Sequence, residues 1–172
     1  QPPAGLKPAE VPQLVAITFD DNFGLAAHGS VGGVNAIVQY YAGKRNPMGK
    51  GDAADFGGAP IRTTFFDTAI FMVDSTTTVL GGMRGKDRSG RNRAAWRSAF
   101  AAGPESADHT VNHLNGGGVL INEDECCRPR DWSVEQWRAE IASCRTVLTA
   151  SRFGLGAKAV IGFRSPYLSY ND

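Results

Sequence analysis

The chain has 172 residues, which is enough for one domain with a hydrophobic core, and its formal net charge is +1. Its lysines and arginines are dispersed, which argues against a nucleic-acid partner or an anionic membrane surface, and no apolar run is long enough to span a bilayer. The 21 glycines predict a protein rich in loops.

The N-terminal end is Pro-rich and polar. We expect residues 1–11 to form a tail and residues 12–172 to form one domain. This opening is typical of a mature N-terminus left after removal of a signal peptide, or of the start of an expressed fragment, and both explanations stay open. The first explanation predicts a secreted or extracytoplasmic protein.

Three short apolar runs predict strands of a sheet. Residues 14–19 (LVAITF), 61–66 (IRTTFF) and 157–163 (AKAVIGF) contain β-branched and aromatic residues. Such runs are typical of parallel strands that are buried on both faces. Between the first two, residues 43–60 are rich in glycine and have no hydrophobic period, which predicts a surface loop.

Three segments are predicted to be helices, at residues 34–42, 91–103 and 132–150. The last is the strongest, because Ser133 and Gln136 can form a capping box at its start. Its apolar stripe consists of Trp137, Ile141, Cys144 and Leu148. Strands that alternate with helices favour an α/β fold with a parallel sheet.

The chain contains three cysteines, Cys126, Cys127 and Cys144. Adjacent cysteines rarely pair with each other, because the geometry is strained. We expect one of the first two to form a disulfide with Cys144 in an oxidising compartment; three buried thiols are the alternative.

Candidate catalytic side chains follow two of the predicted strands. Asp20 and Asp21 come directly after the first strand, and the carboxyl ends of strands hold the active sites of α/β proteins. A turn or a helix cap is the simpler explanation of this pair taken alone. Arg164 follows the third strand, where a guanidinium can hold a carboxylate in place; a surface arginine in a turn is the alternative.

Two of the three histidines lie in the segment HTVNH. On a helical turn, the spacing of His109 and His113 places both imidazoles on one face. This spacing is common among metal ligands, and two ordinary surface histidines are the alternative. His28, in a Gly-rich stretch, carries no functional signal.

Together these residues indicate a metal site. Two imidazoles and one carboxylate are a good ligand set for Zn²⁺ or a similar divalent ion, with positions left for water and substrate. The second carboxylate could then act as a general base toward water. The sequence pattern alone does not assign these two roles between Asp20 and Asp21.

Three motifs in order resemble a known family. TFDD, HTVNH and RSPY resemble the first three motifs of the polysaccharide deacetylases, carbohydrate esterase family 4, also called the NodB-homology domain. PIRTTFF resembles the second strand of that domain. The likeness runs from about Pro12 to the C-terminus and is nearest to chitin deacetylase-like members.

The resemblance implies a distorted (β/α) barrel and a metal-dependent hydrolase that removes acetyl groups from N-acetylated sugars. It implies that Asp20 is the catalytic base, that Arg164 orients it, and that the Tyr167 N–H stabilises the oxyanion. The implied ligands of one divalent ion, expected to be Zn²⁺, are Asp21, His109 and His113.

The chain departs from the family pattern in two places. Asn22 stands where the family usually has glycine, and we expect it to change the turn and not the ligands. The family also has two later motifs, one with an Asp near a Trp and one with a His as general acid. Nothing after RSPY supplies them, so we expect the last barrel strands and the general acid to come from a further C-terminal segment of the same polypeptide or from a partner segment.

The expected partner is an acetylated glycan, and three functions stay open. The first is N-deacetylation of a chitin-like polysaccharide or oligosaccharide. The second is deacetylation of acetylxylan or peptidoglycan by the same site. The third is carbohydrate binding by a relative without turnover.

Overall fold

The computed structural model describes the segments that form the predicted sheet and its helices. It describes residues 5–7, 15–22, 24, 33–48, 57–73, 78–79, 83–84, 90–114, 116–117 and 131–168. Cys126, Cys127 and His28 lie outside these residues.

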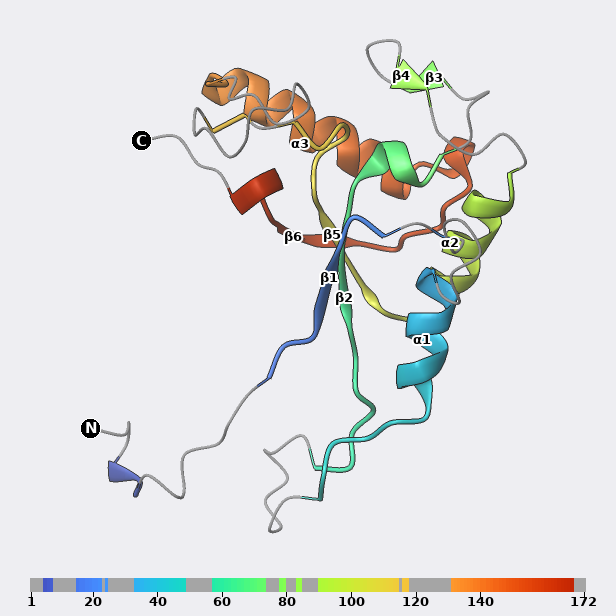
Figure 1. Ribbon diagram of the computed structural model, residues 1–172, viewed down its shortest axis with the longest axis vertical. Helices are drawn as coiled ribbons and strands as arrows, with labels where there is room; N and C mark the ends of the chain where they lie inside the picture. Colours follow the sequence, from blue (N-terminus) through green and yellow to red (C-terminus); the bar gives the residue numbers. More distant parts are fainter. Residues whose placement is uncertain are drawn as a thin grey trace.

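A four-stranded parallel sheet forms the centre of the described fold (Figure 1). Its strands, in spatial order, are β1 (Thr18–Asp20), β2 (Thr64–Asp67), β5 (Glu105–Asp108) and β6 (Val160–Phe163). The register pairs Phe19 with Phe65 and Asp67 with Asp108. Because all the strands are parallel, their carboxyl ends meet at one edge of the sheet.

In the described part of the chain, three α-helices pack around this sheet. They are α1 (Val34–Ala42), α2 (Arg91–Ala101) and α3 (Val134–Thr149). Figure 1 shows α1 and α2 next to each other beside the sheet, and α3 near the carboxyl ends of the strands. Within the described residues, none of the helices has both the length and the apolar composition needed to cross a bilayer.

The remaining described elements are short. They are the 3₁₀ helices η3 (Ala69–Phe71), η6 (Ser151–Phe153) and η7 (Pro166–Leu168), and an antiparallel ribbon of β3 (Thr78–Val79) and β4 (Met83–Arg84). At the predicted loop 43–60, the Asn46 N–H donates to the Ala59 carbonyl at 2.9 Å and closes the base of the loop.

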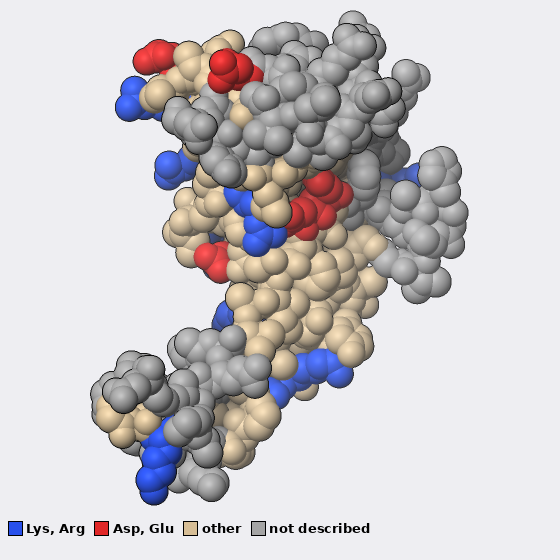
Figure 2. Space-filling view, turned by 60° about the vertical axis from the view of Figure 1, so that its left-hand side comes forward, with Lys and Arg blue, Asp and Glu red and all other residues tan. Residues whose placement is uncertain are grey.

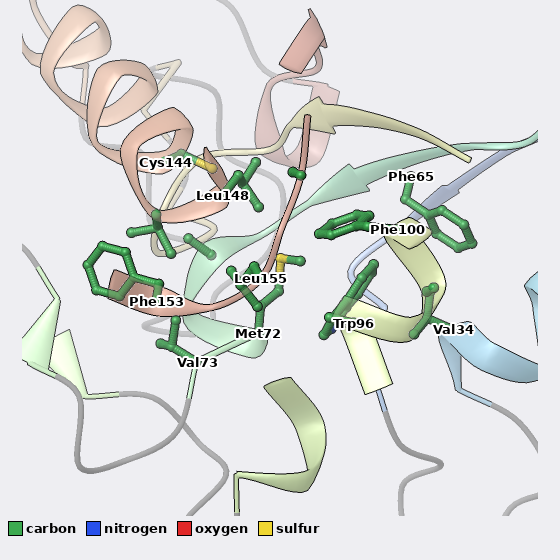
Figure 3. Close-up of a cluster of buried hydrophobic side chains, with 14 of the residues drawn as sticks. Val34, Phe65, Met72, Val73, Trp96, Phe100, Cys144, Leu148, Phe153 and Leu155 are labelled. Carbon is green, nitrogen blue, oxygen red and sulfur yellow. The ribbon is translucent and has the colours of Figure 1, made fainter. Parts of the chain in front are cut away.

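The hydrophobic core lies between the sheet and the helices (Figure 3). Phe65 stacks on Phe19 with ring centroids 5.5 Å apart, and it meets Trp96 of α2 edge-on at 5.7 Å. On α3, Leu148 is fully buried. Burying a side chain such as Phe or Leu contributes roughly 1.5–3 kcal/mol to the stability of the fold. These contacts therefore hold the strands in place, and with them the polar residues at the strand ends.

The helix predictions are confirmed. The predicted helix 34–42 coincides with α1, and α2 ends two residues before the predicted end at residue 103. At the start of α3, the Gln136 N–H donates to Ser133 Oγ at 3.3 Å, and the Gln136 side chain accepts from the Ser133 N–H at 2.8 Å. This is the predicted capping box.

The strand prediction at residues 14–19 is wrong in its extent. β1 begins only at Thr18, and Val15 is 76% exposed. Burial on both faces also fails for β6, where Ile161 is 73% exposed. The reason is topological, because β1 and β6 are the two outer strands of the described sheet.

The sequence prediction contains no strand at β5. Its residues read ESAD, and a run without large apolar side chains gives no periodic strand signal. Yet β5 lies inside the sheet, between β2 and β6. The α/β fold with parallel strands is confirmed, but the described residues form an open sheet and do not by themselves close the expected barrel.

Cys144 is a free thiol, which corrects the predicted disulfide. The side chain is fully buried on α3, and its Sγ lies 3.4 Å from the carbonyl oxygen of Asp67. The helix therefore packs this thiol against the main chain of β2.

Charged side chains are scattered in small groups of both signs over the face shown in Figure 2. This distribution agrees with the dispersed basic residues of the sequence and its net charge of +1.

Candidate metal centre

Polar side chains follow all four strands at the edge where the strands end. Asp20 ends β1 and Asp21 follows it, Thr68 follows β2, His109 follows β5, and Arg164 follows β6. Open α/β sheets bind their ligands at the carboxyl ends of the strands. The fold thus brings the residues singled out in the sequence to one place.

Asp20 and Asp21 turn their carboxylates toward different partners. Asp21 has φ of 54°, in the left-handed region, so the chain bends sharply at the end of β1. The side chain of Asn22 supports this bend, because its Nδ2 donates to the Asp20 carbonyl at 3.1 Å. As a result Asp21 faces the two histidines while Asp20 faces Arg164.

His109 and His113 meet, but not on a helical turn as the spacing predicts. Residues 109–113 form a loop in which Thr110 has φ of 68° and His113 has φ of 55°. The ring centroids of the two imidazoles lie 4.9 Å apart. Left-handed backbone at Thr110 and His113, and not helical periodicity, therefore brings the two rings together.

The ring of His109 is oriented by the main chain of β6. Its Nδ1 lies 2.7 Å from the carbonyl oxygen of Arg164, which can only accept, so Nδ1 carries the proton. Burial lowers the pKa of His109, which favours the neutral ring. The lone pair of Nε2 then points toward Asp21, the arrangement that metal-binding histidines use.

Asp21, His109 and His113 form a cluster that fits a metal ion. One ligand atom from each residue lies within 4.8 Å of the other two, and Nε2 of His113 is 3.0 Å from Asp21 Oδ2. Burial raises the pKa of Asp21, but the hydrogen bond and charge of His113 and the hydroxyl of Thr68 outweigh it and lower the pKa. Two imidazoles and an ionised carboxylate are a donor set suited to Zn²⁺.

Arg164 is clamped between β1 and β2. Its guanidinium lies 2.6 Å from Asp20 Oδ1 and 3.3 Å from the Thr18 hydroxyl. It also stacks on the Phe66 ring, with Cζ 3.9 Å from the ring centroid. Since three contacts from different directions restrain the guanidinium, the carboxylate of Asp20 is held in a defined orientation.

Tyr167 lies beside the cluster, in η7. It has φ of 58°, and its ring centroid is 4.7 Å from that of His113. The fold therefore brings Tyr167 next to one of the candidate ligands. Its expected role as an oxyanion donor stays a prediction.

Sequence reasoning missed Thr68. Its Oγ lies 2.8 Å from Asp21 Oδ1 and 3.4 Å from the His109 carbonyl oxygen, so it contacts two of the three candidate ligands. The available signal was a threonine two residues after the predicted strand 61–66, but threonine is too common at such positions to stand out.

Comparison with known proteins supports the fold alone. No family model matches the chain, and no curated protein matches it. A solved structure with a similar fold is a family 4 carbohydrate esterase from Streptomyces lividans in complex with acetate, with a TM-score of 0.50 and 18% identity. The match covers 91% of this chain and 53% of that structure, so this chain spans about half its length.

Proposed function

We propose that this chain is a metal-dependent hydrolase that removes N-acetyl groups from a chitin-like polysaccharide or oligosaccharide. The main observation behind the proposal is that two adjacent carboxylates contact different partners. Asp21 lies against two imidazoles, and Asp20 is held apart from them by Arg164 at 2.6 Å. A structural turn needs no such separation of the two carboxylates, whereas metal-assisted hydrolysis can use one as a ligand and the other as a base.

In this proposal, Asp21, His109 and His113 hold one divalent ion, expected to be Zn²⁺. When bound, such an ion polarises a carbonyl oxygen and makes water easier to deprotonate. The fit rests on the donor set itself: its ligand atoms lie within 4.8 Å of one another, and His109 already has the tautomer that frees Nε2.

Asp20 is the proposed general base. Its side chain is 35% exposed, so water and substrate can reach it, and the contact with Arg164 holds it in one orientation. The base takes a proton from the attacking water. Negative charge then develops on the acetyl oxygen, and a hydrogen-bond donor is needed to stabilise it. The N–H of Tyr167, beside His113, is proposed for that role.

The general acid is proposed to come from a further segment of the polypeptide that also closes the barrel. Both histidines in the described part of the chain are taken as ligands. β6 is an outer strand of the described sheet with Ile161 exposed, a surface that an added strand would cover. We further propose a secreted or extracytoplasmic location, because chitin-like polymers lie outside the cytoplasm.

The test measures metal content and acetate release together. Wild-type protein should contain about one divalent ion per chain by mass spectrometry. It should also release acetate from N-acetylglucosamine oligomers, and His109→Ala/His113→Ala should lose both the ion and the activity. Asp20→Asn is the matched control, because it should keep the ion.

Two alternatives give different results in this experiment. A carbohydrate-binding relative would bind the oligomers with its metal in place and release no acetate. An acetylxylan or peptidoglycan deacetylase would release acetate from those glycans and not from the oligomers. Absence of any metal in the wild type after incubation with Zn²⁺ would contradict the proposal itself.

A further inference from the structure

The loop that carries the two histidines has a complete set of backbone hydrogen bonds. Every N–H group from residue 109 to residue 113 has an acceptor. In chain order the acceptors are the Asp67 carbonyl oxygen, Asp108 Oδ1, Glu140 Oε1 for two consecutive groups, and Thr110 Oγ. The loop is therefore held by specific partners and not only by packing.

Glu140 is the one acceptor among these that comes from a helix distant in sequence. A single oxygen of its carboxylate accepts from the N–H groups of Val111 and Asn112, at 3.0 Å each. Two successive N–H groups that converge on one anion form a nest, and hydrogen bonds to a charged acceptor are stronger than neutral ones. The contacts lie between the two histidines in sequence.

The loop needs such a partner because its backbone is strained. Thr110 and His113, on either side of the residues held by Glu140, both have positive φ, which is unfavourable for residues other than glycine. Such conformations persist only where the surroundings impose them. The Ile70 N–H holds the loop from the opposite side, at 3.0 Å from the Val111 carbonyl oxygen.

We propose that Glu140 is a positioning residue for the metal centre. Its carboxylate fixes the left-handed loop that brings His109 and His113 onto Asp21. This inference rests on the proposed function only in that these three side chains bind a divalent ion. α3 suits this role, because Cys144, Val147 and Leu148 bury it against the sheet and so make the carboxylate a fixed point.

The test compares Zn²⁺ affinity, by competition with a chromophoric chelator, in wild type and four variants. Glu140→Ala should weaken binding by about 10- to 100-fold, the usual effect of losing a residue that orients metal ligands. Glu140→Gln keeps an acceptor oxygen, so its Zn²⁺ affinity should fall less than that of Glu140→Ala. Glu135→Gln removes the same charge from an exposed position on α3 and should bind as wild type. Glu140→Asp shortens the side chain and moves the carboxylate away from the loop. Its Zn²⁺ affinity should lie between those of Glu140→Ala and the wild type.

Amide hydrogen exchange on metal-free protein supplies a second readout. Exchange at Val111 and Asn112 should rise in Glu140→Ala and not in Glu135→Gln. The absorption spectrum of the Co²⁺-loaded protein should also change, which a purely stabilising residue would not cause.

Three outcomes are decisive against the inference. Folded Glu140→Ala with wild-type affinity and wild-type exchange would overturn it. If that variant does not fold, equal affinity in wild type, Glu140→Gln and Glu140→Asp would overturn it instead. A wild type that binds no Zn²⁺ would overturn the proposed function and the metal role of Glu140 with it, a result distinct from the other two.

Discussion

The carbonyl oxygen of Arg164 lies 2.7 Å from Nδ1 of His109, while the guanidinium of the same arginine lies 2.6 Å from Asp20. One residue at the end of β6 therefore orients a candidate ligand through its main chain and the candidate base through its side chain. These two functions are separable, because a substitution of Arg164 removes the side-chain contact with Asp20 and keeps the main-chain carbonyl.

Arg164→Gln should keep the metal and lose activity. The main-chain carbonyl that orients His109 remains, so Zn²⁺ affinity should stay close to that of the wild type. Acetate release should fall on the order of 100-fold, since a misplaced catalytic group costs about that much. Arg164→Lys is the control; it restores the charge without the planar fork and should recover part of the activity. Loss of the metal in Arg164→Gln would contradict this separation.

Asp20 and Asp21 should respond differently to the same substitution. Asp20→Asn should bind Zn²⁺ normally but lose roughly 10²–10⁴-fold in activity, the usual contribution of a general base. Asp21→Asn should lose the metal, because an amide oxygen is a poorer ligand and no longer neutralises the ion. Metal analysis beside an acetate assay distinguishes the two, and the reverse pattern would show that the roles are exchanged.

Asp108 should make the metal-free protein less stable as pH rises. Burial raises the pKa of Asp108 to about 6 from 3.8. The folded state thus holds a proton that the unfolded state has lost, and the associated stability is complete below pH 3.8 and disappears as pH rises through about 6. A shift of about two pKa units corresponds to roughly 3 kcal/mol.

Urea unfolding between pH 4.5 and 7.5 measures this effect. Asp108→Asn keeps an oxygen for the Thr110 N–H, which lies 2.8 Å from the Asp108 carboxylate, and should flatten the pH dependence. Equal pH profiles for wild type and variant would mean that Asp108 titrates normally in the folded protein.

Cys144 should be unreactive in the folded protein and reactive once it unfolds. Burial raises the pKa of its thiol well above the usual value, and the side chain is fully buried. Iodoacetamide followed by peptide mapping should leave Cys144 unlabelled under native conditions and label it in urea without a reductant. If labelling in urea requires a reductant, the residue is in a disulfide after all.

The helices were predictable because their signals are local. The capping box of Ser133 and Gln136, and the apolar stripe through Cys144 and Leu148, lie within one segment and need no knowledge of the rest of the chain. The strand ends were predictable for the same reason, since apolar runs followed by Asp20 or Arg164 mark them directly.

The middle of the sheet and the shape of the histidine loop were not predictable in this way. β5 lies inside the sheet but is polar, and both Ser106 and Asp108 are buried. The Ser106 hydroxyl donates to Asp67 Oδ2 on β2, a bond that forms only when the two strands meet. The loop depends on Glu140, which is close to Val111 in space but not in sequence. A local pattern contains no information about such partners.

The ion pair between Asp20 and Arg164 joins residues that are 144 positions apart. During synthesis, the ribosome therefore releases all three candidate metal ligands well before it releases the residue that orients one of them. The interval from His113 to Arg164 is about 50 residues, or on the order of 3–10 s at about 5–20 residues per second. A nascent chain can thus meet a metal ion while its last described strand is still inside the exit tunnel. Docking of β6 is then the step that brings the Arg164 carbonyl to His109 and the Arg164 guanidinium to Asp20.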